Sequence, residues 1–94
     1  MMPHKFDVAI TEYREAHQWC EVLTGDALSV ARDEETEALD ALIRTPSECL
    51  GDIGDKLTVL QRLMQEGRWF DGRDFQLLDS IRRDVKAMLL KWQG

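Results

Sequence analysis

The sequence of 94 residues has little of what anchors or cross-links specialised chains: two cysteines, two prolines and no apolar run longer than Ala87 to Leu90. Two cysteines, Cys20 and Cys49, are too few for a disulfide framework, so we expect free thiols in a reducing compartment. A run of four apolar residues is far too short to cross a membrane. Residues 1–10 also lack the apolar core of a secretory signal. We therefore expect a cytoplasmic protein with no membrane partner.

An excess of basic charge is also lacking, since 12 Lys and Arg stand against 18 Asp and Glu, a net charge of −6. Residues 1–55 hold 4 basic and 13 acidic residues, whereas residues 56–94 hold 8 and 5. An acidic chain repels phosphate backbones. The one concentrated basic group, Arg82, Arg83, Lys86 and Lys91, is interleaved with Asp79 and Asp84. A solvated helix face explains that mixture, and we expect no nucleic-acid partner.

What the sequence does have is apolar residues in steps of three and four, the spacing typical of helices. One stripe runs from Tyr13 to Ala31 and resumes in phase from Ala38 to Ile43. Two more stripes follow, and we expect them to form the core: Leu50, Ile53, Leu57, Leu60 and Met64, then Leu78, Ile81, Val85, Met88 and Trp92. Gly67 is placed to end the second helix. No run alternates as a strand would, so the pattern predicts an all-α protein.

The segment Thr45-Pro46-Ser47-Glu48 divides the chain. Thr45 is suited to cap a following helix, Pro46 to occupy its first position and Glu48 to complete a capping box. We therefore predict one domain, residues 1–94, with a three-helix arrangement. A long N-terminal helix, Asp7 to Arg44, packs on a C-terminal antiparallel αα-hairpin.

Gly25 is the main reason to consider a break in the long helix. A break between Gly25 and Glu37 would produce a four-helix bundle instead. The stripe keeps its phase across this region, and a single Gly costs a helix only ~1 kcal/mol, so we favour the continuous helix.

A continuous first helix would be about 57 Å long, against about 26 Å for the hairpin helix from Leu50 to Glu66. About half of it would lack intramolecular cover. We therefore predict a two-fold homodimer in which Leu23, Val30 and Leu42 contact a second copy. The adjacent aromatics Trp69 and Phe70 lie in a turn-like loop and could contact an unknown protein partner or plug the end of the hairpin.

Glu12-x-x-Glu15 and Glu37-x-x-Asp40 match the loose ExxE and ExxD spacing of nucleotide pyrophosphohydrolases of the MazG type. In those enzymes, carboxylates from two facing helices hold Mg²⁺ beside a triphosphate. On one continuous helix the two pairs would lie ~37 Å apart, so only a hairpin or a second chain could unite them. We predict no catalytic, cofactor-binding or metal-binding residue, and keep this Mg-dependent enzyme as the alternative function.

One further pattern resembles small helical proteins of bacterial and prophage genomes that have no assigned function. It consists of Thr45-Pro46-Ser47, Asp52, Lys56-Leu57, Leu60, Asp74, Leu77-Leu78, Ser80-Ile81 and Asp84-Val85. The resemblance implies a helical fold and a bacterial or phage setting, and it carries over no functional residue. The sequence therefore favours a small non-catalytic scaffold or adaptor that acts through protein–protein contacts, without identifying its partner.

Overall fold

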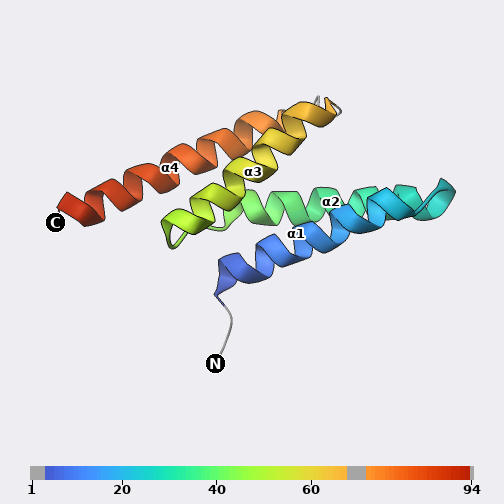
Figure 1. Ribbon diagram of the computed structural model, residues 1–94, viewed down its shortest axis with the longest axis horizontal. Helices are drawn as coiled ribbons and strands as arrows, with labels where there is room; N and C mark the ends of the chain where they lie inside the picture. Colours follow the sequence, from blue (N-terminus) through green and yellow to red (C-terminus); the bar gives the residue numbers. More distant parts are fainter. Residues whose placement is uncertain (1–3, 68–71, 94) are drawn as a thin grey trace. The chain divides into compact units, whose positions relative to one another are not determined.

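The computed structural model describes residues 4–67 and 72–93. Within them it contains no strand and four helices: α1 (Lys5–Val22), α2 (Gly25–Arg44), α3 (Leu50–Glu66) and α4 (Arg73–Gln93) (Figure 1). The all-α class is thus confirmed. The three-helix count is wrong, and the four-helix alternative has the right number. None of the described helices is long and apolar enough to span a membrane.

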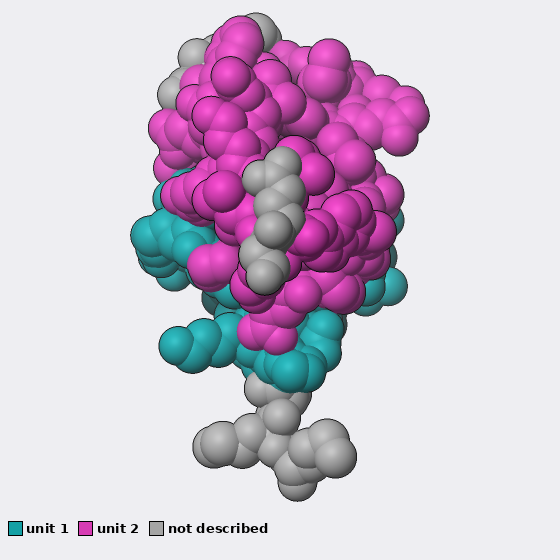
Figure 2. Space-filling view, turned by 90° about the vertical axis from the view of Figure 1, so that its left-hand side faces the viewer, with its two compact units in different colours: residues 1–45 teal, residues 46–94 magenta. Residues whose placement is uncertain are grey.

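The chain forms two compact units, residues 1–45 and residues 46–94 (Figure 2). Unit 1 is the antiparallel hairpin of α1 and α2, and unit 2 is the antiparallel hairpin of α3 and α4 (Figure 1). Each hairpin positions one of the two surfaces considered below.

The break between α1 and α2 falls at Leu23 and Thr24, directly before Gly25. Both residues have extended backbone, and Gly25 has a φ of 63°, a left-handed conformation that costs glycine little. The Leu23 N–H still donates to the Trp19 carbonyl at 3.0 Å, and the Leu28 N–H donates to the Thr24 carbonyl at 3.4 Å, so both helix ends are satisfied locally. Folding back lets α1 and α2 bury their own apolar faces, which outweighs the lost helical continuity.

Unit 1 buries one face of each helix. The buried residues are Phe6, Ala9, Ile10, Tyr13, Ala16 and His17 from α1, and Ala31, Glu35, Leu39 and Leu42 from α2. Two polar residues belong to this core, because His17 Nδ1 lies 2.6 Å from Glu35 Oε2 and the Tyr13 ring stacks on the His17 ring. Glu35 is fully buried.

The segment after α2 is a helix boundary, but the predicted capping box is wrong. Thr45 ends α2, and its hydroxyl donates to the Ala41 carbonyl at 2.7 Å. Helix α3 begins only at Leu50, after Cys49. The Glu48 N–H donates to Asp52 Oδ2 at 2.8 Å. A carboxylate in the first turn of α3 therefore pairs with this backbone N–H in place of the predicted capping box.

The buried faces of α3 and α4 differ from the predicted stripes. The buried residues are Ile53, Lys56, Val59 and Leu63 from α3, and Leu77, Ser80, Ile81 and Asp84 from α4. Of the ten stripe residues, only Ile53 and Ile81 are buried. At 100° per residue, each buried face is turned from its stripe by roughly a fifth to a quarter of a turn. Gly67, with a φ of 65°, ends α3 as predicted.

A buried polar network explains this rotation. Lys56 Nζ donates to Asp84 Oδ2 at 2.7 Å and to Ser80 Oγ at 2.8 Å, and the Lys56 side chain is fully buried. The same Asp84 oxygen accepts from the Ser47 N–H at 3.1 Å and from the Ser47 hydroxyl at 2.6 Å. A buried ammonium must be paired and hydrogen-bonded. The network therefore holds α3, α4 and the segment before α3 in one arrangement.

We expect Lys56→Met to destabilise the protein by about 3 to 5 kcal/mol, because it leaves the Asp84 carboxylate buried without its cation. Urea denaturation followed by circular dichroism measures this change. The exposed pair Arg82–Asp79, 3.8 Å apart on the same helix, provides the control, and Arg82→Met should cost less than about 1 kcal/mol. Equal costs for the two variants would contradict a structural role for the network.

Candidate functional site

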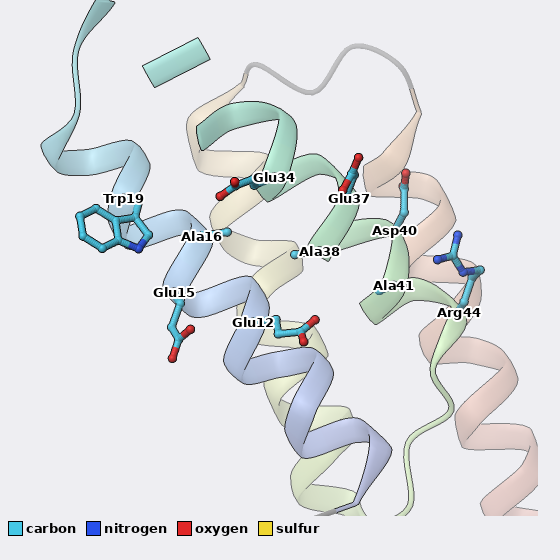
Figure 3. Close-up of a pocket in the computed structure, with 10 residues that line it drawn as sticks. All are labelled: Glu12, Glu15, Ala16, Trp19, Glu34, Glu37, Ala38, Asp40, Ala41 and Arg44. Carbon is cyan, nitrogen blue, oxygen red and sulfur yellow. The ribbon is translucent and has the colours of Figure 1, made fainter. Parts of the chain in front are cut away.

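An acidic groove of about 570 Å³ lies between α1 and α2, within unit 1. Three alanines lie between the helices, and charged side chains and one exposed tryptophan surround them (Figure 3). The lining residues are Glu12, Glu15, Ala16, Trp19, Glu34, Glu37, Ala38, Asp40, Ala41 and Arg44. The small alanine side chains leave the space, and the hairpin supplies its two walls.

The hairpin brings together the two carboxylate pairs of the ExxE and ExxD pattern. His17 on α1 contacts Glu35 on α2. Because the two helices run antiparallel, a residue a given number of positions before His17 lies level with the residue the same number of positions after Glu35. Glu15 is thus level with Glu37, two positions away, and Glu12 is level with Asp40, five positions away. All four line the groove. The condition that a hairpin must unite the pairs is therefore met.

The carboxylates share the groove without converging on one point. In Figure 3, Glu37 and Asp40 point to the same side of α2, with Arg44 near them, whereas Glu15 points away from both. Across residues 4–67 and 72–93, no group of three or more His, Cys, Asp or Glu side chains is placed to hold a metal ion. Magnesium needs oxygen ligands in near-octahedral geometry at about 2.0–2.1 Å. As arranged, the groove presents an acidic surface on unit 1.

A second candidate surface lies on unit 2, where apolar side chains stay exposed. We name it the α3–α4 apolar face, and it consists of Leu50, Leu57, Met64, Phe75, Leu78, Val85, Leu89 and Trp92. Met64, Phe75 and Trp92 are each about 70% exposed. A shallow hollow of about 430 Å³ lies against Leu57, Leu60 and Met64. Contiguous exposed apolar side chains are typical of interaction sites.

Helix geometry places both halves of this face on one side of unit 2. The α3 half recurs every seven residues, and the α4 half follows a 3-4 spacing with Arg82 as its polar interruption. At 100° per residue, the exposed apolar residues of each helix lie about the helix axis in the same rotational direction from the buried residues of that helix. Because α3 and α4 run antiparallel, equal rotations turn both halves toward the same side of the hairpin. The result is a two-helix surface rather than two separate strips.

The predicted interaction residues have different environments. Leu42 is fully buried in unit 1, Leu23 is half-buried at the α1–α2 connection, and Val30 is 59% exposed on α2. They form no common surface in the hairpin. Trp69 and Phe70 lie outside the described residues. The dimer through the first helix was predicted because about half of that helix would lack intramolecular cover. In the structure α2 covers α1 within the same chain, so this reason for a dimer is removed.

The polar residues that organise the two hairpins were not predicted from the sequence. Asp84 was assigned to a solvated helix face, Lys56 and Ser80 were assigned no role, and His17 and Glu35 were not paired. One signal was present, because Ser80 and Asp84 are four residues apart and therefore share a helix face. Four members of the pattern resembling small bacterial and prophage proteins, Ser47, Lys56, Ser80 and Asp84, form the buried network.

Comparison with protein-family models, with curated protein sequences and with solved structures finds no match to this chain. The function of the protein must therefore be inferred from the acidic groove and the α3–α4 apolar face.

The like charges on the two walls of the groove should repel each other and lower the stability of the hairpin. We expect the double variant Glu15→Gln/Glu37→Gln to be more stable than wild type by a few tenths of a kcal/mol at 10 mM salt, because it relieves like-charge repulsion across the hairpin. The gain should vanish in 1 M NaCl, where the screening length falls to about 3 Å. Thermal unfolding at both salt concentrations measures it.

Glu21→Gln is the control, since it removes an α1 carboxylate that lies outside the groove beside His17 Nε2. It should give no stabilisation at either salt concentration. A double variant that is less stable than wild type at low salt would mean that the groove carboxylates make net favourable contacts.

Proposed function

We propose that this is a small non-catalytic helical protein that acts through protein–protein contacts, as a scaffold or adaptor, and that it forms a homodimer. The α3–α4 apolar face is the single observation that carries the proposal. Its eight side chains include two aromatics, the residue class that dominates interface energetics. Exposed apolar side chains lower the solubility of a protein, and a specific contact that buries them would remove this effect.

The occupant that fits this face is the same face of a second copy. Apolar residues spaced by seven on α3 and by three and four on α4 are the pattern with which helices of bundles interdigitate. A two-fold contact places the same patch of both copies together, so apolar side chains meet apolar side chains. Two hairpins packed face to face would form a four-helix core.

The exposed area is sufficient for such a contact. With roughly 100 to 200 Å² for each large apolar side chain, the exposed fractions of the eight residues amount to on the order of 700 Å². A standard stable interface buries about 800 Å² on each partner. Polar residues at the rim, such as Gln61, would add the remainder.

We expect light scattering coupled to size exclusion to give the mass of a dimer at about 100 μM, well above a dissociation constant of ~1 μM. Leu57→Asp and Leu89→Asp should each give the monomer mass, because a charge placed in the face must be desolvated. The control is Val22→Asp, a substitution on α1 at an exposed valine outside the face, which should stay dimeric. A monomeric wild type, or a loss of the dimer in Val22→Asp alone, would contradict this interface.

The second candidate function is the Mg-dependent nucleotide pyrophosphohydrolase, and the hairpin favours it by placing Glu12, Glu15, Glu37 and Asp40 in one groove. Binding of Mg²⁺ and a triphosphate would have to draw these carboxylates together. Water would then attack the triphosphate, releasing a nucleoside monophosphate and pyrophosphate.

Under the non-catalytic proposal, incubation with MgCl₂ and deoxynucleoside triphosphates should release no pyrophosphate above the protein-free blank. The melting temperature should also stay constant as Mg²⁺ and nucleotide rise together, because a ligand stabilises only a state that it binds. A rising melting temperature, with turnover that Glu37→Gln abolishes and Glu21→Gln preserves, would replace the proposal by the enzyme.

A further inference from the structure

The connection between α1 and α2 lies at the short end of the roughly two to five residues that usually join two antiparallel helices. Only Leu23 and Thr24 lie between the two helices. Their ψ angles of 154° and 165° are extended, and Gly25 follows with a φ of 63°. Moving these three residues to the helical region near φ −63°, ψ −42° would join α1 and α2 into one helix without a steric obstacle, since none of them is proline. Short hinges of this kind favour the exchange of elements between copies.

The buried faces of the two helices stay in phase across the connection. His17 and Glu35 are 18 residues apart, which is five turns at 3.6 residues per turn. Phe6 and Leu42, both fully buried, are 36 residues apart, or ten turns. A straightened helix would therefore carry the buried residues of α1 and of α2 on the same side. An arbitrary break in a helical pair would not have this property.

This phase has a direct structural consequence. Two straightened copies lying antiparallel, with a two-fold axis near Asp26, would bring α1 of each chain onto α2 of the other. His17 of one copy would then meet Glu35 of the second copy, because the two positions are equally far from the axis. The hydrophobic contacts of the hairpin would re-form between chains in the same register.

We propose that the α1–α2 hairpin opens at Leu23–Gly25 and exchanges α1 with a second copy of the chain. The acidic groove is then built from two chains, with Glu12 and Glu15 from one and Glu37 and Asp40 from the other. This inference deepens the proposed self-association by naming an exchanged segment, and it uses unit 1 rather than the α3–α4 apolar face.

The balance between the closed and exchanged forms depends on concentration. Within one chain, a two-residue connection holds α1 beside α2 at an effective concentration in the millimolar range, which favours the closed hairpin in dilute solution. Straightening returns Leu23 and Thr24 to helical hydrogen bonding and removes the left-handed turn at Gly25. The exchanged form is therefore favoured at high protein concentration and by any change that disfavours the turn.

Gly25→Ala is such a change. A side chain at a φ of 63° penalises the closed turn, while alanine favours the straight helix. Acting at the hinge of both chains, the substitution should raise the two-chain fraction by at least tenfold at a fixed concentration. The matched control is Gly54→Ala, because Gly54 lies within α3 with open space around it and no positive φ.

The test uses the full chain with Cys20→Ser, Cys49→Ser, Glu12→Cys and Asp40→Cys, so that one thiol lies on each wall of the groove. Leu89→Asp is added to remove the contact between α3–α4 faces. The protein is refolded at concentrations from 5 μM to 1 mM and treated with a short bis-maleimide, and denaturing electrophoresis separates one-chain from two-chain products. Circular dichroism verifies that each variant remains helical.

We expect one-chain products at 5 μM, two-chain products that increase with concentration, and a further increase with Gly25→Ala but not with Gly54→Ala. One-chain products throughout, including in helical Gly25→Ala, would overturn the exchange. That outcome would leave the α3–α4 interface standing if Leu89→Asp is monomeric by light scattering. The reverse pattern, a dimer unaffected by Leu89→Asp and strengthened by Gly25→Ala, would overturn that interface and support the exchange.

Discussion

The contact between Lys56 and Asp84 is the constraint on which unit 2 depends. A buried ammonium is tolerated only when a carboxylate and further hydrogen bonds surround it, and here Ser80 and Asp84 supply both. These partners lie on one face of α4, so that face must turn toward α3. The 3-4 apolar stripes are consequently turned outward. The surface that we propose for protein contacts therefore follows from a polar requirement inside the hairpin.

Unit 1 shows the same principle with a different pair. His17 and Glu35 meet inside the α1–α2 hairpin, and that single contact sets the register of the two helices. The register places Glu15 level with Glu37 and Glu12 level with Asp40, so the acidic residues of two distant segments line one groove. Among the described residues, these carboxylates lie on both sides of the alanine floor and do not form a cluster placed to hold a metal ion.

The two proposed contacts use different units of the chain. Contact between α3–α4 faces joins two copies through unit 2, whereas exchange of α1 joins two copies through unit 1. Each contact has two-fold symmetry, and a chain that makes both is linked to two neighbours. If both contacts formed with different copies, assemblies larger than the proposed dimer would result, and their size would depend on protein concentration because exchange competes with the closed hairpin.

The sequence by itself determined the all-α class, the existence of α3 and α4, and the end of α3 at Gly67, because these depend on local periodicity and a left-handed cap. Tertiary structure decided the rest. A helix through Gly25 and a hairpin at Gly25 are locally close in free energy, and only the burial of α1 on α2 separates them. Likewise, periodicity identified apolar stripes but could not predict that Lys56 would be buried. The free energy of a buried charge depends on a partner 28 residues away, and local sequence does not report that distance.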